Sequence, residues 1–304
     1  MRFSTLLAQG LLAISSVVSA VAIDKRQSTT QVYKFSASPT SAEGIAARSN
    51  GQLLVSFFDK GELWGVDPAT KKASKVATFT DATCAGGIAE IAPDVFAVVA
   101  GQFSFGGGLK TGSWAIWKVD FTSGTAQTSV LKKVPDSGFF NGLSAFTNDT
   151  ILIGDASKGA VVAMNVNTGA YSTVIQDATM APPANAGIPM GIDGVRYFNG
   201  TLYYTNVSKN TFHKVAVDAT GKKVGNIATI WSNTFSDDLW VGPDGTAYVA
   251  TGSAGKIQKV TPDGRISTLV NISGATSVTL GKTEADKNTL YIAGNNGVIS
   301  SVKV

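Results

Sequence analysis

Short apolar runs alternate with clusters of Gly, Asp, Asn and Ser along most of the chain. This pattern is typical of short strands joined by turns, and helical periodicity is almost absent. The runs recur as a unit in which a usually polar residue leads a first strand, and a turn and a second strand follow. The leading residue lies nine or ten positions ahead of the second strand in the four clearest copies, which begin at Glu43, Asn141, Asp193 and Asp237.

The unit occurs six times, and its later strands predict how the chain closes. A third strand follows in every copy and a fourth in five of them, whereas the sixth copy ends with the chain. Residues 31–35 form an additional strand that belongs to no unit. We therefore predict an all-β fold, a single six-bladed β-propeller over residues 31–304 whose last blade is closed by the N-terminal strand.

The leading residues are the candidate chemistry of this fold. The first strand of each propeller blade lines the central channel, so these residues should form one ring: Glu43, Gly86, Asn141, Asp193, Asp237 and Thr276. Three carboxylates in one ring repel one another unless a cation is present, and oxygen ligands suit Ca²⁺ or, next, Mg²⁺. The alternative is that these polar groups start strands and bind local turn amides.

Composition narrows the function classes. Only 15% of residues are charged and Gly numbers 33, which favours strands and turns over helices. The net charge of +4 is spread without a basic block, so we expect no nucleic-acid partner. His213, the only histidine, falls on a third strand away from the axis, which disfavours a Ser-His-Asp triad or a His-rich zinc site. Cys84, the only cysteine, is expected to be a buried thiol and not a nucleophile.

The N-terminus indicates export from the cell. Residues 1–22 have the composition of a signal peptide, and residues 23–30 form a short segment with a dibasic site at Lys25-Arg26. No second apolar span follows, so we expect a secreted or lumenal protein with no membrane contact after signal removal. Four sequons predict N-glycosylation, at Asn148, Asn199, Asn206 and Asn271.

Several stretches together resemble one family. They are Ala42-Glu43-Gly44, Phe140-Asn141-Gly142-Leu143-Ser144, residues 194–206, residues 237–251 and Gly274-Ala275-Thr276-Ser277-Val278. The chain resembles the senescence marker protein/gluconolactonase/luciferin-regenerating (SGL) family of six-bladed propellers, and is closest to a secreted fungal branch that includes hetero-Diels–Alderases.

The resemblance implies a divalent cation on the axis, bound by Glu43, Asn141, Asp193 and Asp237, with Asp237 as general base. Three positions depart from the family pattern. Asp193 stands where Asn is usual, Asp238 replaces a Gly, and Ile45-Ala46-Ala47 replaces Pro-Val-Trp. The additional carboxylate should tighten cation binding and make the metal a weaker Lewis acid.

Three functions are compatible with this sequence. A metal-dependent lactonase or esterase would use Asp237 or Asp238 to take a proton from water. A cyclase of the hetero-Diels–Alderase type would join a tropolone quinone methide to a terpene alkene in meroterpenoid biosynthesis. A binding propeller would recognise a glycan or peptide without chemistry. Aromatic residues near the ring or in the insertion at 102–112 favour the cyclase: Phe103, Phe105, Phe140, Phe235 and Trp240. We expect this enzyme to bind an apolar small-molecule substrate, to need no organic cofactor and to be a monomer.

Overall fold

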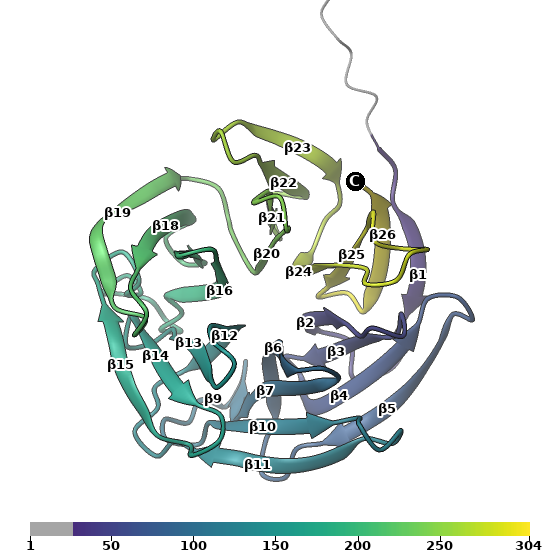
Figure 1. Ribbon diagram of the computed structural model, residues 1–304, viewed down its shortest axis with the longest axis horizontal. Helices are drawn as coiled ribbons and strands as arrows, with labels where there is room; N and C mark the ends of the chain where they lie inside the picture. Colours follow the sequence, from purple (N-terminus) through teal and green to yellow (C-terminus); the bar gives the residue numbers. More distant parts are fainter. Residues whose placement is uncertain (1–26) are drawn as a thin grey trace, which may run out of the picture.

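The computed structural model describes residues 27–304, which form strands and turns and contain no helix. Six four-stranded antiparallel sheets surround a central axis (Figure 1). Five are consecutive in sequence: β2 (Ala42–Ala47), β3 (Leu53–Phe57), β4 (Lys60–Asp67) and β5 (Lys72–Thr78); β6 (Cys84–Ala92), β7 (Val95–Gly101), β10 (Ala115–Asp120) and β11 (Gln127–Lys133); β12 (Phe140–Ala145), β13 (Thr150–Asp155), β14 (Ala160–Asn165) and β15 (Tyr171–Gln176); β16 (Ile192–Phe198), β17 (Thr201–Asn206), β18 (Thr211–Val217) and β19 (Lys223–Trp231); β20 (Leu239–Val241), β21 (Ala247–Ala250), β22 (Lys256–Val260) and β23 (Ile266–Asn271). The predicted six-bladed propeller is confirmed.

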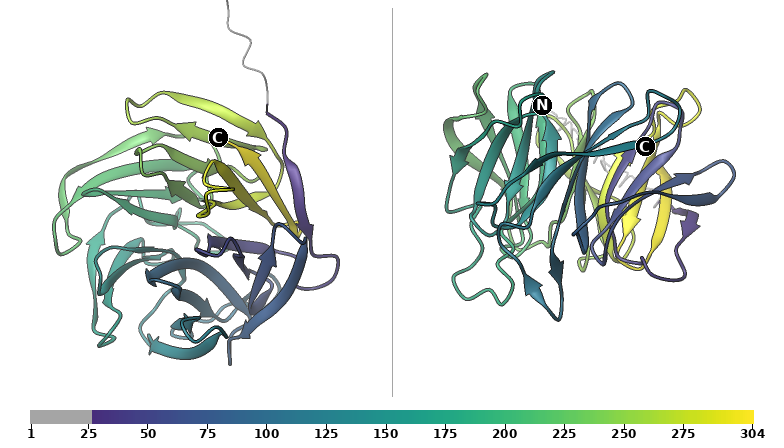
Figure 2. Two further views of the ribbon diagram at one scale, coloured as in Figure 1. Left: turned by 45° about the vertical axis from the view of Figure 1, so that its right-hand side comes forward. Right: turned by 90° about the horizontal axis from the view of Figure 1, so that it is seen from below.

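The sixth blade joins the two ends of the described chain. Its strands are β24 (Ala275–Leu280), β25 (Thr289–Gly294), β26 (Val298–Lys303) and, outermost, β1 (Thr30–Lys34). β1 pairs antiparallel with β26, so that Thr30 lies opposite Ser301 and Lys34 opposite Val298. Figure 2 shows β1 along the outer edge of this blade. The predicted closure by the N-terminal strand is therefore confirmed, and it pairs the edge that β26 would otherwise expose.

The apolar core lies between neighbouring blades. Leu54 and Leu63 of the first blade pack with Ile88 and Val98 of the second, and equivalent clusters fill the other interfaces. Each sheet is therefore covered on both faces by its neighbours, which explains why its inner strands consist of nearly continuous apolar residues.

The innermost strands contain a repeated irregularity. In five of the six, the pairing with the second strand shifts register directly beside the ring position, as it does between Ala42 and Ile45 in β2 and between Ile192 and Val195 in β16. A bulge inserts an additional residue, so side chains after it change the face to which they point. This shift determines which residues line the far part of the channel.

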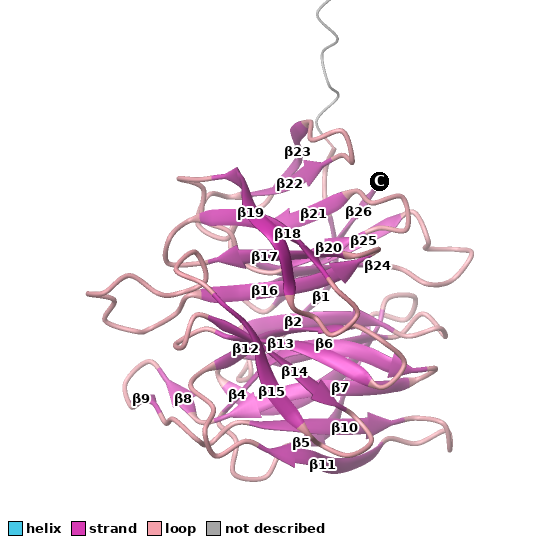
Figure 3. Cartoon of the chain, turned by 60° about the vertical axis from the view of Figure 1, so that its left-hand side comes forward, coloured by secondary structure: helices cyan, strands magenta, loops and turns pink. Residues whose placement is uncertain are grey.

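Insertions lie at the face where the innermost strands begin, called here the acidic face. Residues 102–112 include the small hairpin of β8 (Phe103–Ser104) and β9 (Gly108–Leu109), visible at the side of the ring in Figure 3. The insertion at 181–190 leads into β16, and its Ile188 and Met190 pack on the same apolar cluster as Phe103. The two insertions thus converge near the ring of leading residues.

The predicted signal peptide and Lys25-Arg26 lie outside the described residues. Within residues 27–304, no helix is long and apolar enough to cross a membrane.

One of the four predicted glycosylation sites is buried in the folded chain. The side chain of Asn206 is fully buried, and its Nδ2 donates to the carbonyl oxygens of Thr179 and Ala181, 2.9 Å from each. A glycan would replace one of the two hydrogens of this nitrogen and so remove one of the two bonds, and the buried position leaves no space for a sugar. Asn148, Asn199 and Asn271 are exposed in or beside turns.

Glycopeptide mass spectrometry of the protein from a glycosylating host tests this difference. We expect glycan at one or more of Asn148, Asn199 and Asn271 and an unmodified Asn206. Occupancy at Asn206 in natively folded protein would contradict the burial of its side chain.

Candidate functional site

Four leading residues meet at the acidic face. Asn141 Nδ2 donates to Asp193 Oδ2 at 2.9 Å and lies 3.4 Å from Glu43 Oε1. Carboxylate oxygens of Glu43, Asp193 and Asp237 all lie within 4.8 Å of one another. The structure therefore brings together all four predicted ligands, in a cluster called here the acidic site.

The other two leading residues, Gly86 and Thr276, add no carboxylate to the acidic site. A Cβ atom at Gly86 would lie 2.9 Å from Asn141 Oδ1, so only glycine leaves room for that amide. Thr276 donates its hydroxyl to the carbonyl oxygen of Ala42 at 2.8 Å and links the last blade to the first.

Two buried hydroxyls fix the backbone that carries the acidic site. Ser56 Oγ accepts from Gly44 N at 2.9 Å and donates to Gly86 O in the next blade at 2.5 Å. Thr205 Oγ1 likewise accepts from Gly194 N at 2.9 Å and donates to Asp237 O at 2.6 Å. Since each hydroxyl joins two blades, it sets the distance between their leading residues.

Burial strongly disfavours the charged form of all three carboxylates. It raises the pKa of Glu43 to about 7, against the hydrogen bond from Asn141 and with a smaller repulsion from Asp238. Burial is also the main cause that raises the pKa of Asp193 and that of Asp237 well above the ordinary value, and the neighbouring carboxylates add to it. The protein alone therefore does not neutralise this cluster.

The donor set fits a hard divalent cation. Three carboxylates are ligands that Ca²⁺ prefers, and a cation would relieve the repulsion among them. The neutral amide of Asn141, whose Nδ2 donates to two of these carboxylates, does not offset this repulsion. Asn141 would turn its amide oxygen toward the ion. Glu43, Asn141, Asp193 and Asp237 are the residues that would hold the ion.

Asp238 lies apart from the carboxylate cluster. Its Oδ2 accepts from Arg196 Nη2 at 3.2 Å and from Ser277 Oγ at 2.7 Å, and its Oδ1 accepts from Leu239 N at 2.8 Å. It occupies the position after the leading residue, where four other blades have glycine against the next blade. These bonds hold Asp238 between blades, so only Asp237 of the two predicted catalytic residues joins the acidic site.

Four aromatic rings lie together near the starts of β2, β6 and β12. Phe58 stacks near Phe103 and Phe105, with ring centroids 4.7 and 5.7 Å away, and Phe103 lies 5.3 Å from Phe139. These four residues, Phe58, Phe103, Phe105 and Phe139, are called here the aromatic surface. Phe105 is 74% exposed, whereas the other three are buried beneath it.

The aromatic surface lies on the acidic face. The backbone N–H of Phe58 donates to Ser41 O at 2.8 Å, two residues before Glu43. Phe139 likewise lies two residues before Asn141, and Phe103 N donates to Thr83, which precedes β6. Phe58 was not among the predicted binding residues. Its signal was its place directly after β3, whose Phe57 pairs with Ala42.

The remaining predicted aromatics occupy different places. Phe140 is fully buried in the core, and Phe235 packs in the turn that leads to Asp237. Trp240 lines a separate cavity at the opposite end of the channel, called here the distal end. The aromatic residues predicted to bind substrate are therefore not one surface.

Neither Cys84 nor His213 is placed for catalysis. Cys84 is buried, and burial followed by the nearby Glu43 charge raises the pKa of its thiol well above normal. His213 stacks on Tyr204 with ring centroids 5.0 Å apart, and burial lowers the pKa of its imidazole. Both observations agree with structural roles.

The chain resembles known proteins in sequence. Residues 193–296 match the family model described as "SMP-30/Gluconolactonase/LRE-like region". The resemblance to the SGL family is confirmed. A "Putative hetero-Diels-Alderase" from Phoma sp is 25% identical over 84% of the chain and 84% of its own length. Another protein of that description, from Sarocladium schorii, is 25% identical over 83% of the chain and 74% of its own length.

Solved structures support the fold. Regucalcin from Agrobacterium tumefaciens, described as a calcium-binding protein, superposes with a TM-score of 0.64 at 12% identity, over 86% of the chain and 90% of its own. At this identity the likeness concerns the architecture alone. The SGL-like propeller is thus similar in sequence to proteins named as putative hetero-Diels-Alderases and similar in fold to a calcium-binding protein.

Proposed function

We propose that this SGL-like propeller is a secreted enzyme that binds an apolar small molecule at its acidic face and acts as a hetero-Diels–Alderase-type cyclase. The observation that carries the proposal is the aromatic surface beside the acidic site, with Phe105 presented to solvent. An exposed ring on a hairpin, stacked on buried rings, is suited to contact a large apolar ligand. The names of the two sequence relatives support the same reaction class.

The reaction has few chemical requirements. A quinone methide supplies a four-atom C=C–C=O unit and a terpene such as humulene supplies an alkene; one C–C and one C–O bond form, with no leaving group and no net proton transfer. The protein therefore has to orient two partners and exclude water, and well-oriented reactants gain effective molarities of about 10⁵ M or more. The lack of a catalytic role for Cys84 and His213 is compatible with this chemistry.

The acidic site would orient the oxygen-bearing partner. The Asn141 amide is fixed by Asp193 and Glu43, so it presents a defined polar group beside the aromatic surface. A divalent cation bound by Glu43, Asn141, Asp193 and Asp237 would supply Lewis-acid polarisation of a substrate oxygen.

A metal-dependent lactonase is the second candidate, favoured by the three clustered carboxylates. In this case Asp237 would take a proton from the attacking water, because burial raises the pKa of its carboxyl group well above the ordinary value and makes the carboxylate a stronger base. Asp238, paired with Arg196, would position the neighbouring backbone and would not act as the base.

One set of assays separates the candidates. The purified chain is incubated with a tropolone quinone methide formed in situ and humulene, and in parallel with a panel of lactones, each with and without EDTA. We expect the cycloadduct to form faster than without protein. Lactone turnover that EDTA abolishes, without cycloadduct, would establish the second candidate. Tight binding of a glycan without turnover of either substrate would indicate a binding propeller. Recovery from culture medium with a mature start near Gln27 tests secretion.

Replacement of Phe105 by Ser tests the aromatic surface. We expect the KM for the apolar partner to rise about fivefold to tenfold, since an exposed phenyl contact contributes roughly 1–1.5 kcal/mol. Stability should change little because Phe105 is 74% exposed. Val224→Ser is the matched control, since Val224 is 53% exposed on the outer strand β19. Equal kinetics for the two variants would remove Phe105 from the binding site.

A further inference from the structure

The distal end of the channel contains a second ring of side chains. The cavity there, of about 140 Å³, is lined by the residues three positions after the six leading residues: Ala46, Ala89, Ser144, Arg196, Trp240 and Thr279. A regular strand would point a residue three positions on to the other face, but in the five innermost strands other than β20, the bulges beside the leading residues restore the direction toward the axis. The same repeat that builds the acidic site therefore builds this cavity.

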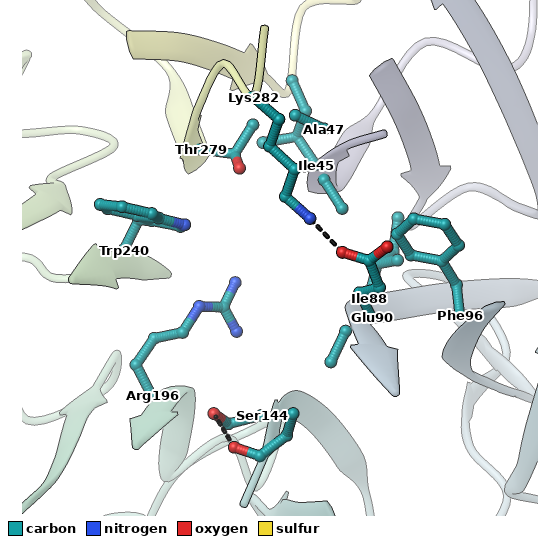
Figure 4. Close-up of a pocket in the computed structure, with 13 residues that line it drawn as sticks. Ile45, Ala47, Ile88, Glu90, Phe96, Ser144, Arg196, Trp240, Thr279 and Lys282 are labelled. Carbon is teal, nitrogen blue, oxygen red and sulfur yellow. Dashed lines mark hydrogen bonds and ion pairs between the residues drawn. The ribbon is translucent and has the colours of Figure 1, made fainter. Parts of the chain in front are cut away.

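Two cationic side chains reach this cavity, and each is paired with a carboxylate: Arg196 with Asp238 and Lys282 with Glu90. Its lining has two cationic side chains, Arg196 and Lys282, and one carboxylate, Glu90. The Glu90 carboxylate already has two partners, because it pairs with Lys282 and accepts a hydrogen bond from Asp94 N at 2.8 Å. Figure 4 shows Arg196, Trp240, Lys282 and Glu90 extending into the same space from separate blades.

Hydrogen-bond donors remain free in the cavity. Arg196 Nη1 donates to the carbonyl oxygens of Leu143 and Val195, and Nη2 donates once to Asp238, so Nε and one Nη2 hydrogen have no partner within residues 27–304. The indole N–H of Trp240 also lacks a partner in this described part of the chain and faces the cavity. The Arg196 side chain is 13% exposed, and its free donors and the Trp240 indole N–H reach the cavity, where a ligand could replace water as their acceptor.

We propose that the distal cavity binds a small organic monocarboxylate. The carboxylate would accept hydrogen bonds from the Arg196 guanidinium and from the Trp240 indole N–H. Hydrogen bonds that involve a charged group are stronger than those between neutral groups. Ile45, Ile88 and Phe96 form the apolar part of the lining and would contact the alkyl portion. This site is separate from the acidic site and does not depend on the function proposed for it.

Propionate is the probe, with propionamide as its neutral equivalent of nearly the same shape. Titration calorimetry with the full-length mature chain should show saturable binding of propionate and none of propionamide. Trp240→Phe retains the ring and removes the donor, so affinity should fall about tenfold. Lys282→Gln should weaken it about fivefold by removing a cation from the lining.

Glu90→Gln is the decisive variant because it should gain affinity. Gln retains the acceptor for Asp94 N, removes the negative charge and frees Lys282, so propionate should bind about fivefold tighter. A gain cannot result from misfolding. Glu43→Gln, at the acidic site, should leave propionate affinity unchanged. No saturable propionate binding, equal binding of propionamide, or weaker binding by Glu90→Gln would overturn the proposal.

Discussion

In the presence of EDTA, the chain is expected to lose stability as the pH rises from about 5 to about 8, on the order of 2 kcal/mol. Most proteins gain or hold stability over this range. Here burial raises the pKa of Glu43 from 4.5 to about 7, and it raises the pKa values of Asp193 and Asp237 as well. The folded chain then binds more protons than the unfolded chain between the two pKa values. Stability is therefore full below the unfolded pKa and is lost as pH rises through the folded one. Urea unfolding at several pH values measures this slope.

Calcium should reverse the slope. An ion that binds only the folded state stabilises it by about 2.7 kcal/mol at a hundredfold excess over Kd, and ionised carboxylates bind it best, so the gain should be largest at pH 8. A chain whose stability in EDTA does not fall with pH, and does not respond to Ca²⁺ or Mg²⁺, would contradict cation binding at the acidic site.

Asp193→Asn tests whether charge repulsion within the acidic site lowers the stability of the folded chain. Asn can still accept the hydrogen bond from Asn141 Nδ2, while one charge is lost. We expect this variant to be more stable than the parent in EDTA at pH 8, by about 1 kcal/mol, and to gain less from calcium. Asp218→Asn, at an exposed turn, is the control and should retain the calcium response of the parent. Destabilisation of Asp193→Asn both with and without calcium would rule out the repulsion.

The repeat made the acidic site predictable, because residues at one place in a propeller unit share one radius and height. Glu43, Asn141, Asp193 and Asp237 therefore meet even though about 200 residues separate the first from the last. The pairing of β1 with β26 was predictable for a related reason: a strand without a unit and a unit without a fourth strand complete each other.

The direction of individual side chains was less predictable. Trp240 was expected near an apolar ligand at the ring of leading residues, but it lies at the distal end, because three residues along the innermost strand carry the chain from Asp237 toward the other end of the channel. Asp238 follows Asp237 directly, yet its bonds to Arg196 and Ser277 hold it between blades. Asn206 matches a sequon, but its amide is used to bind two backbone carbonyls. For Asp238 and Asn206, the partners come from segments remote in sequence.

Gly142→Ala is expected to destabilise the chain by about 3 kcal/mol or more, because the new Cβ would lie 2.1 Å from the backbone oxygen of Asp193. That oxygen belongs to β16, so it cannot move without displacing the innermost strand of the next blade. The glycine is needed for this close approach. Since displacement of β16 would also move Asp193 away from Asn141, the variant should bind calcium more weakly. Urea unfolding and calcium titration measure the two effects.

Gly187→Ala is the matched control for this substitution. Gly187 lies in the exposed insertion before β16, and a Cβ atom there would meet no atom within 4 Å. Its stability should therefore stay within about 0.5 kcal/mol of the parent. If Gly142→Ala were as stable as Gly187→Ala, the blades would have to be free to separate at the axis. The acidic site would then owe its spacing to the bound cation and not to the packing of β12 against β16.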